Sequence, residues 1–96
     1  NELQSKSAAL IFKASQSSLS FLNLSNNPIR GDCASELQEF LKSKSLVSLF
    51  LEETMLGNIG VGAIARGLAK SNLKQLQIEG AGFDEEGATM MLDALK

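Results

Sequence analysis

The sequence predicts an α/β fold in which a parallel β-sheet lines one face, α-helices line the other, and the chain winds as a right-handed solenoid. Two observations favour this fold. A short leucine motif recurs at a fixed interval, and the hydrophobic period changes from two to about 3.6 within each interval. Stacked units of this kind bury a continuous core that one unit cannot bury alone. We therefore expect a single domain over residues 1–96.

The leucine motif reads L-x-x-L-x-[LI] and occurs three times. Its copies begin at Leu19, Leu46 and Leu73, a spacing of 27 residues each time. Alternating apolar residues are typical of strands with one buried face. The predicted strands are about 20–24, 47–51 and 74–78. Their inward side chains are expected to be Leu22, Leu24, Leu49, Leu51, Leu76 and Ile78.

The second half of each unit has the spacing of an amphipathic helix. Ala34, Leu37, Gln38 and Leu41 fall three, four and seven positions after the first of them, which places them on one helix face. The same spacing occurs at Val61, Ile64, Ala65 and Leu68, at Ala88, Met91, Leu92 and Leu95, and at Ser7, Leu10, Ile11 and Ala14. The predicted helices are about 2–16, 32–43, 58–70 and 84–95, with Asp32, Asn58 and Asp84 as capping residues at three of the starts.

The two periodicities stay in phase, and the chain resembles the leucine-rich-repeat family, specifically its ribonuclease-inhibitor-like class with a helix in each long repeat. The resemblance implies a horseshoe segment with the sheet on its concave face and the helices on its convex face. Residues 1–18 would be a helical half repeat, followed by repeats over 19–45, 46–72 and 73–96. The asparagine that bonds the loop backbone in this family is Asn27 in the first repeat, but Thr54 and Ala81 stand at the equivalent positions. The family's small residue near each helix start is Cys33, Gly60 or Gly87.

The composition indicates neither a catalytic site nor a surface that binds polyanions. Nine basic and eleven acidic residues give a net charge of −2, which makes no electrostatic case for nucleic acid or an anionic membrane. The chain has no histidine, and no apolar run is long enough to span a bilayer. Gly57, Gly60 and Gly62 follow a strand, but their spacing is not that of a dinucleotide or phosphate loop, so no cofactor or metal is expected. Cys33 is the one cysteine, which favours a reducing, intracellular compartment such as the cytoplasm.

We therefore expect a non-catalytic protein-interaction scaffold that binds its partner on the concave face. Phe21 and Phe50 alternate with the inward leucines and should point outward, where exposed aromatic side chains often contact partners. The predicted partner-binding residues are Phe21, Asn23, Phe50, Glu52, Glu53, Gln75, Gln77 and Glu79. Two simpler interpretations stay open: the phenylalanines cover each other or a preceding strand, and the glutamates form a solvated rim.

Two further possibilities follow from the same resemblance. Some proteins of this repeat class activate a small GTPase, and Arg30, in the loop after the first strand, is the candidate arginine for such a role. The outermost strands also lack neighbours in this chain, so their free edges and the ends of the core favour self-association.

Overall fold

The computed structural model of the chain describes residues 5–14 and 19–94. Within these residues the fold is mixed α/β, with a three-stranded parallel sheet and four α-helices. The helices are α1 (Ser5–Ala14), α2 (Ala34–Phe40), α3 (Gly57–Leu68) and α4 (Glu85–Ala94), and a 3-10 turn, η1 (Gly31–Cys33), precedes α2. The strands are β1 (Phe21–Asn23), β2 (Ser48–Phe50) and β3 (Gln75–Gln77).

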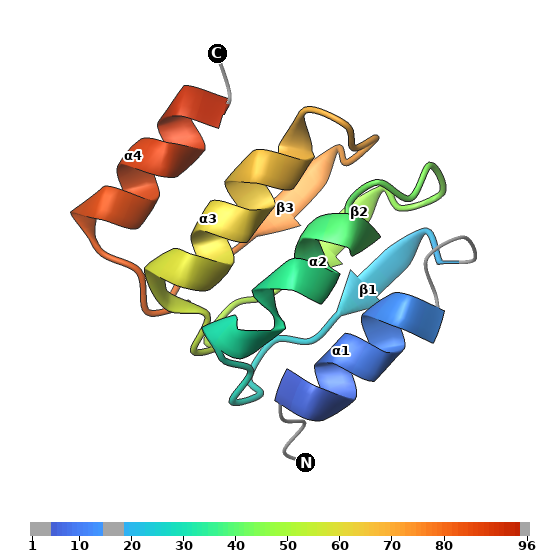
Figure 1. Ribbon diagram of the computed structural model, residues 1–96, viewed down its shortest axis with the longest axis horizontal. Coiled ribbons are helices and arrows are strands. Elements are labelled where there is room, and N and C mark those ends of the chain that lie inside the picture. The colour runs from blue at the N-terminus through green and yellow to red at the C-terminus, as the bar shows by residue number, and fades with distance from the viewer. Residues whose placement is uncertain (1–4, 15–18, 95–96) are drawn as a thin grey trace.

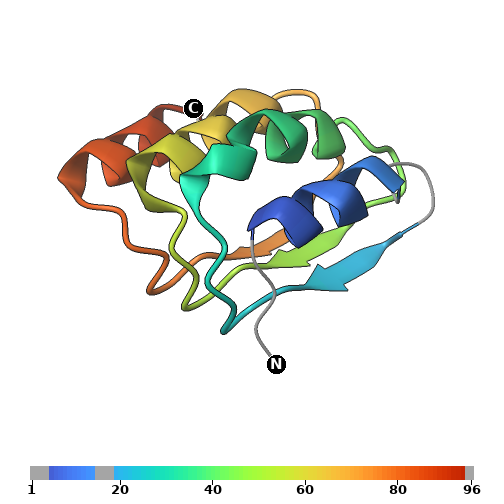
Figure 2. The same ribbon diagram turned by 60° about the horizontal axis from the view of Figure 1, so that its bottom comes forward.

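Each strand is followed by a loop and a helix that returns antiparallel to it, so strands form one layer and helices the other (Figures 1 and 2). The strands lie in the order β1-β2-β3, and both neighbouring pairs are parallel. Leu22 pairs with Leu49, and Leu49 pairs with Leu76. The expectation that these leucines are lateral neighbours is confirmed. The strands are shorter than predicted, although backbone hydrogen bonds between neighbouring segments continue past their ends, as from the Leu24 N–H to the Phe50 carbonyl at 2.9 Å.

The core lies between the two layers and is made of the inward leucines of the strands and one side of the helices. Leu24, Leu49 and Leu51 are buried as predicted, whereas Leu22, Leu76 and Ile78 are partly buried against the same cluster. The helices contribute further buried side chains to the core: Ala8, Phe12, Leu37, Phe40, Leu41, Val61 and Ile64. Ile29 and Leu56, from the loops, close the core at the strand ends.

The predicted apolar face of α1 is wrong except at Ile11, which packs partly against the core. Leu10 is 63% exposed and Ser7 is also exposed, while Ser5, Ala8 and Phe12 face the core instead. Two contacts explain this rotation. The ring of Phe12 packs against Phe40 with 5.1 Å between centroids, and the Ser5 hydroxyl accepts a 2.6 Å hydrogen bond from the backbone N–H of Arg30.

At the other end of the helical layer, Leu92 was also expected in the core but is 65% exposed. Met91, from the same predicted stripe, packs partly against the core. Helix α4 has α3 as its one neighbour among the described helices, so side chains that point away from α3 meet solvent. Leu95 lies outside the described residues.

Of the three predicted helix caps, the one at Asp84 is confirmed and the other two are wrong. Asp84 does cap α4, because its Oδ1 accepts the backbone N–H of Glu86 at 2.9 Å. Asn58 does not cap its own helix: its Oδ1 accepts the backbone N–H groups of Asp84 and Gly87 at 3.1 and 3.0 Å. Asp32 lies within η1 and provides no cap, since neither η1 nor α2 has a side-chain cap. The start of α4 is thus capped both by Asp84 and by Asn58 from α3.

In the turn after each strand, the carbonyl of an inward strand residue accepts a hydrogen bond, and the donor differs among the three turns. The Asn27 side chain donates to the Leu24 carbonyl at 3.0 Å, and the Thr54 hydroxyl donates to the equivalent Leu51 carbonyl at 2.8 Å. Ala81 has no such side chain, and its backbone N–H donates to Ile78 at 3.1 Å. Its neighbours Gly80 and Gly82 have φ of 72° and 81°, a region that glycine reaches without strain. Gly80 shares its positive φ with Asn26 and Glu53 at the equivalent positions of the other turns, whereas Gly82 adds a second left-handed residue in the turn that has Ala81 in place of Asn27.

Candidate interaction surface

The side of the sheet away from the helices carries the residues that the sequence singled out. We call it the outer sheet face and define it by the outward residues of the strands. These are Phe21 and Asn23 on β1, Ser48 and Phe50 on β2, and Gln75 and Gln77 on β3. Parallel pairing places them in two rows across the strands, so the predicted contact residues lie together on one continuous surface.

Phe21 and Phe50 form the apolar part of the outer sheet face. Their ring centroids lie 5.3 Å apart with an interplanar angle of 44°, a favourable tilted arrangement. Phe21 is nevertheless 57% exposed, and Phe50 is half-buried. The two rings therefore do cover each other, as the simpler interpretation held, but they leave an exposed aromatic surface as well.

Polar side chains fill the remainder of this face. The Ser48 hydroxyl donates to Oε1 of Gln75 at 3.4 Å, and Asn23 Oδ1 accepts the backbone N–H of Ser25 at 3.0 Å. Asn23 and Gln75 are exposed, and Gln77 is half-buried. These groups can donate or accept hydrogen bonds with a partner, and none of them carries charge.

Glu52, Glu53 and Glu79 lie at the edge where β2 and β3 end. The backbone N–H of Glu53 donates to the carbonyl of Glu79 at 2.8 Å, so the two turns run side by side. Glu53 and Glu79 are exposed, while Glu52 is half-buried. Glu53 has φ of 56°, a left-handed conformation that is unfavourable for a residue with a side chain. The backbones of Glu53 and Glu79 are therefore adjacent, while the backbone N–H of Glu52 donates to the Ser25 hydroxyl at 3.0 Å.

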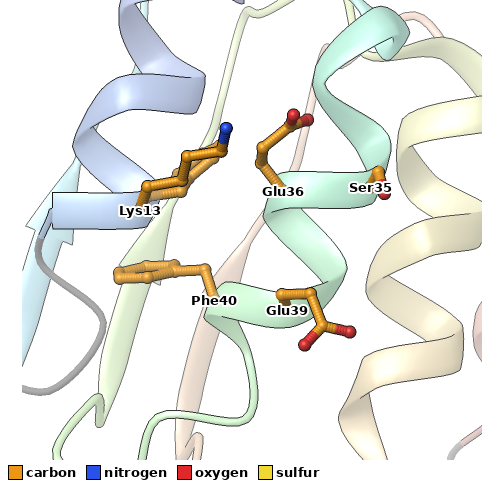
Figure 3. Close-up of a pocket in the computed structure, with 6 residues that line it drawn as sticks. Lys13, Ser35, Glu36, Glu39 and Phe40 are labelled. Atoms are coloured by element: carbon orange, nitrogen blue, oxygen red, sulfur yellow. The ribbon is translucent and has the colours of Figure 1, made fainter.

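A pocket of about 280 Å³ between α1 and α2 was not anticipated from the sequence. Its lining residues are Phe12, Lys13, Ser35, Glu36, Glu39 and Phe40. Lys13 reaches from α1 toward Glu36 on α2 (Figure 3), and Glu39 pairs with Lys42 at 3.0 Å. Acidic and basic groups thus balance one another around it, and the pocket offers no distinct electrostatic preference for a ligand.

Cys33, the small residue near the start of α2, is buried. It is 1% exposed, and its thiol donates a 3.3 Å hydrogen bond to the Arg30 carbonyl. Burial raises the pKa of the Cys33 thiol to about 11, with a smaller contribution from the nearby Asp32 carboxylate. The thiol is therefore protonated at neutral pH, and a protonated thiol is a poor nucleophile and metal ligand.

The described residues contain no group of three or more histidine, cysteine, aspartate or glutamate side chains that could hold a metal ion. Across the same part of the chain, no helix combines the length and the apolar character needed to cross a bilayer. Arg30 is exposed, and its backbone forms an isolated parallel bridge with Met55. No protein family model matches the chain, and no curated protein matches it.

Proposed function

We propose that the chain is a segment of a right-handed leucine-rich-repeat solenoid of the ribonuclease-inhibitor-like class, and that it serves as a non-catalytic scaffold for a protein partner. The outer sheet face is the concave face in this proposal, and the helices form the convex face. Support comes from features that recur 27 residues apart. The in-register leucines are one such feature, and the left-handed residues Asn26, Glu53 and Gly80 are another.

One observation carries the binding proposal: Phe21 is 57% exposed although it stacks on a second aromatic ring. Exposed aromatic area costs free energy in water, and burying it against a partner recovers that energy. Uncharged hydrogen-bonding groups surround the two rings, an arrangement typical of an interface with an apolar centre and a polar rim. The proposed contact residues are the outward strand residues together with Glu52, Glu53 and Glu79.

Self-association is a second part of the proposal about partners. Strands β1 and β3 are the outer strands of the described sheet, and outer strands expose backbone groups that can pair with another chain. A groove of about 310 Å³ beside β3 is lined partly by Leu68, Leu73, Leu76 and Met91. Apolar surface at such an end favours contact with a further strand or repeat.

The double substitution Phe21→Ala and Phe50→Ala tests the binding proposal. Short random peptides displayed in a library would first be selected on the unmodified chain. We expect the double variant to bind the selected peptides at least about tenfold more weakly, because buried aromatic residues are frequent hot spots. The measurement is fluorescence anisotropy with labelled peptides, and the circular dichroism melting curve shows whether the variant remains folded.

Lys42 and Arg66 provide the control for this experiment. Both are exposed in the helical layer. Lys42 lies two residues after the end of α2, and Arg66 lies in α3. Lys42→Ala and Arg66→Ala should leave peptide binding unchanged. The selected peptides could instead still bind the double phenylalanine variant and lose affinity for the Lys42→Ala and Arg66→Ala variants. In that case the binding surface is on the helical side and the proposal is wrong.

A further inference from the structure

Charge is separated along the direction of the strands. The loops that lead into β2 and β3, residues 41–47 and 69–74, contain four lysines and no acidic residue. The loops that follow the strands contain Glu52, Glu53, Glu79 and Asp84, with Arg30 as their one basic residue. Because the strands are parallel, the lysine-containing loops that lead into β2 and β3 lie at one end of the sheet, and the loops that follow the strands lie at the opposite end. Figure 1 shows the course of these loops. The small net charge of the chain conceals this separation.

Helix dipoles do not account for the charges nearest the sheet. Acidic residues favour helix starts and basic residues favour helix ends, which explains Glu85 and Glu86 in the first turn of α4. Glu52, Glu53 and Glu79, however, lie two or three residues past the end of a strand, and Lys74 directly precedes one. Their positions serve no helix terminus, so a different reason for the separation is needed.

These charges are also available to a partner. Lys44, Lys74, Glu53 and Glu79 are all exposed. Within the described part of the chain, none of these four residues forms an ion pair, whereas Lys42 pairs with Glu39 at 3.0 Å. Glu53 and Glu79 lie in adjacent turns joined by a backbone hydrogen bond, and two neighbouring carboxylates repel each other. A cation placed between the two turns would relieve that repulsion.

We infer that the outer sheet face binds a polypeptide segment that is itself charge-polarised and that lies along the strands in one direction. This inference rests on the proposed function and adds the partner's chemistry. An apolar or aromatic side chain of the segment contacts Phe21 and Phe50. A lysine or arginine at one end of the segment meets Glu53 and Glu79, and an acidic residue at the other end meets Lys44 and Lys74. The opposite orientation places like charges together at both edges, so charge selects the direction.

The peptides selected on the unmodified chain provide the probe. Those that depend on Phe21 and Phe50 should carry a basic residue toward one end and an acidic residue toward the other. The double variant Lys44→Glu with Lys74→Glu should bind them about three- to tenfold more weakly at low salt, since each exposed ion pair contributes modestly. The control is Lys6→Glu on α1 with Arg66→Glu on α3, which makes the same change in net charge on the helical side and should leave affinity unchanged.

Orientation is measured separately by NMR. A nitroxide at the basic end of a selected peptide should broaden the amide signals of Glu53 and Gly80, and one at the acidic end should broaden those of Ser48 and Lys74. If peptides require the phenylalanines but show neither paired charges nor sensitivity to lysine reversal, the inference is wrong and the proposed function stands. If no selected peptide requires the phenylalanines, the proposed function fails and the inference fails with it.

Discussion

Leu49→Ala should lower the free energy of unfolding by about 2–5 kcal/mol, the range for large cavities in packed cores. Leu49 is the most constrained of the strand leucines. It is fully buried on the central strand and pairs with a leucine on each side. The neighbouring strands are fixed by backbone hydrogen bonds, so they cannot collapse into the vacated space. Domains are commonly stable by about 5–15 kcal/mol, and this one substitution can therefore unfold a large fraction of the chain.

Chemical denaturation measures this loss through the midpoint and slope of the unfolding transition. Leu10→Ala is the matched control, because the same atoms are removed from a side chain that is 63% exposed. It should change stability by no more than about 0.5 kcal/mol. Equal effects of the two substitutions would mean that Leu49 is not in the core and that the described register is incorrect.

Gly60→Ala should lower the free energy of unfolding by about 1–3 kcal/mol, the usual cost of overpacking. An added Cβ would lie 2.6 Å from the Cβ of Leu56 and 2.8 Å from its Cδ2. Leu56 is itself buried beneath the loop and cannot move away without opening the core. The clash outweighs the roughly 1 kcal/mol by which alanine favours a helix over glycine.

Gly62→Ala is the control on the same helix. Its added Cβ would meet the Met90 sulfur at 3.2 Å and the Arg66 guanidinium at 3.3 Å, both near the free ends of flexible side chains. Those groups can shift by a few tenths of an ångström, so stability should be unchanged or raised by up to about 1 kcal/mol. Thermal melts of both variants give the comparison, and a Gly60→Ala protein as stable as the unmodified chain would contradict the close packing around Leu56.

Much of the fold could be predicted because its two hydrophobic periods are both local and repeated. The alternation at Leu22 and Leu24 identifies the inward side of a strand, and the 27-residue spacing then aligns the next strand with it. The pairing of Leu22 with Leu49 follows from that spacing. The outward direction of Phe21 and Phe50 follows in the same way, since neighbouring strand residues point to opposite faces.

The wrong predictions concern residues whose orientation or hydrogen-bond partner is determined by a tertiary contact. Helix α1 turns Leu10 outward because Phe12 has a ring partner in Phe40 and the Ser5 hydroxyl binds the loop backbone. The hydrophobic periodicity within α1 carries no information about either contact. Asn58 was assigned to its own helix because caps are usually local, yet its side chain reaches the start of α4. A separate hydrogen bond, in which the Asn58 side-chain amide donates to Oδ1 of Asp84 at 2.8 Å, lowers the pKa of the Asp84 carboxyl below its usual value.

The candidate surface, too, could be predicted only in part from the sequence. Its residues could be named from strand alternation, but the stacking of Phe21 on Phe50 depends on the diagonal offset between two strands. The grouping of Glu53 with Glu79 depends on a backbone hydrogen bond between turns. The separation of lysines from carboxylates was concealed by a nearly balanced composition, and it emerged once the strands were known to be parallel.

The most direct test of the central claim is an NMR titration of the isotope-labelled chain with a library-selected peptide, followed through the backbone amide shifts. The account predicts the largest shift changes at Phe21, Asn23, Phe50, Gln75 and Gln77, with smaller changes at Glu53 and Glu79. Amides of the exposed helical side, around Lys42 and Arg66, should remain in place. Shift changes concentrated on α2 and α3, with the strands unaffected, would contradict the claim that the outer sheet face is the binding surface.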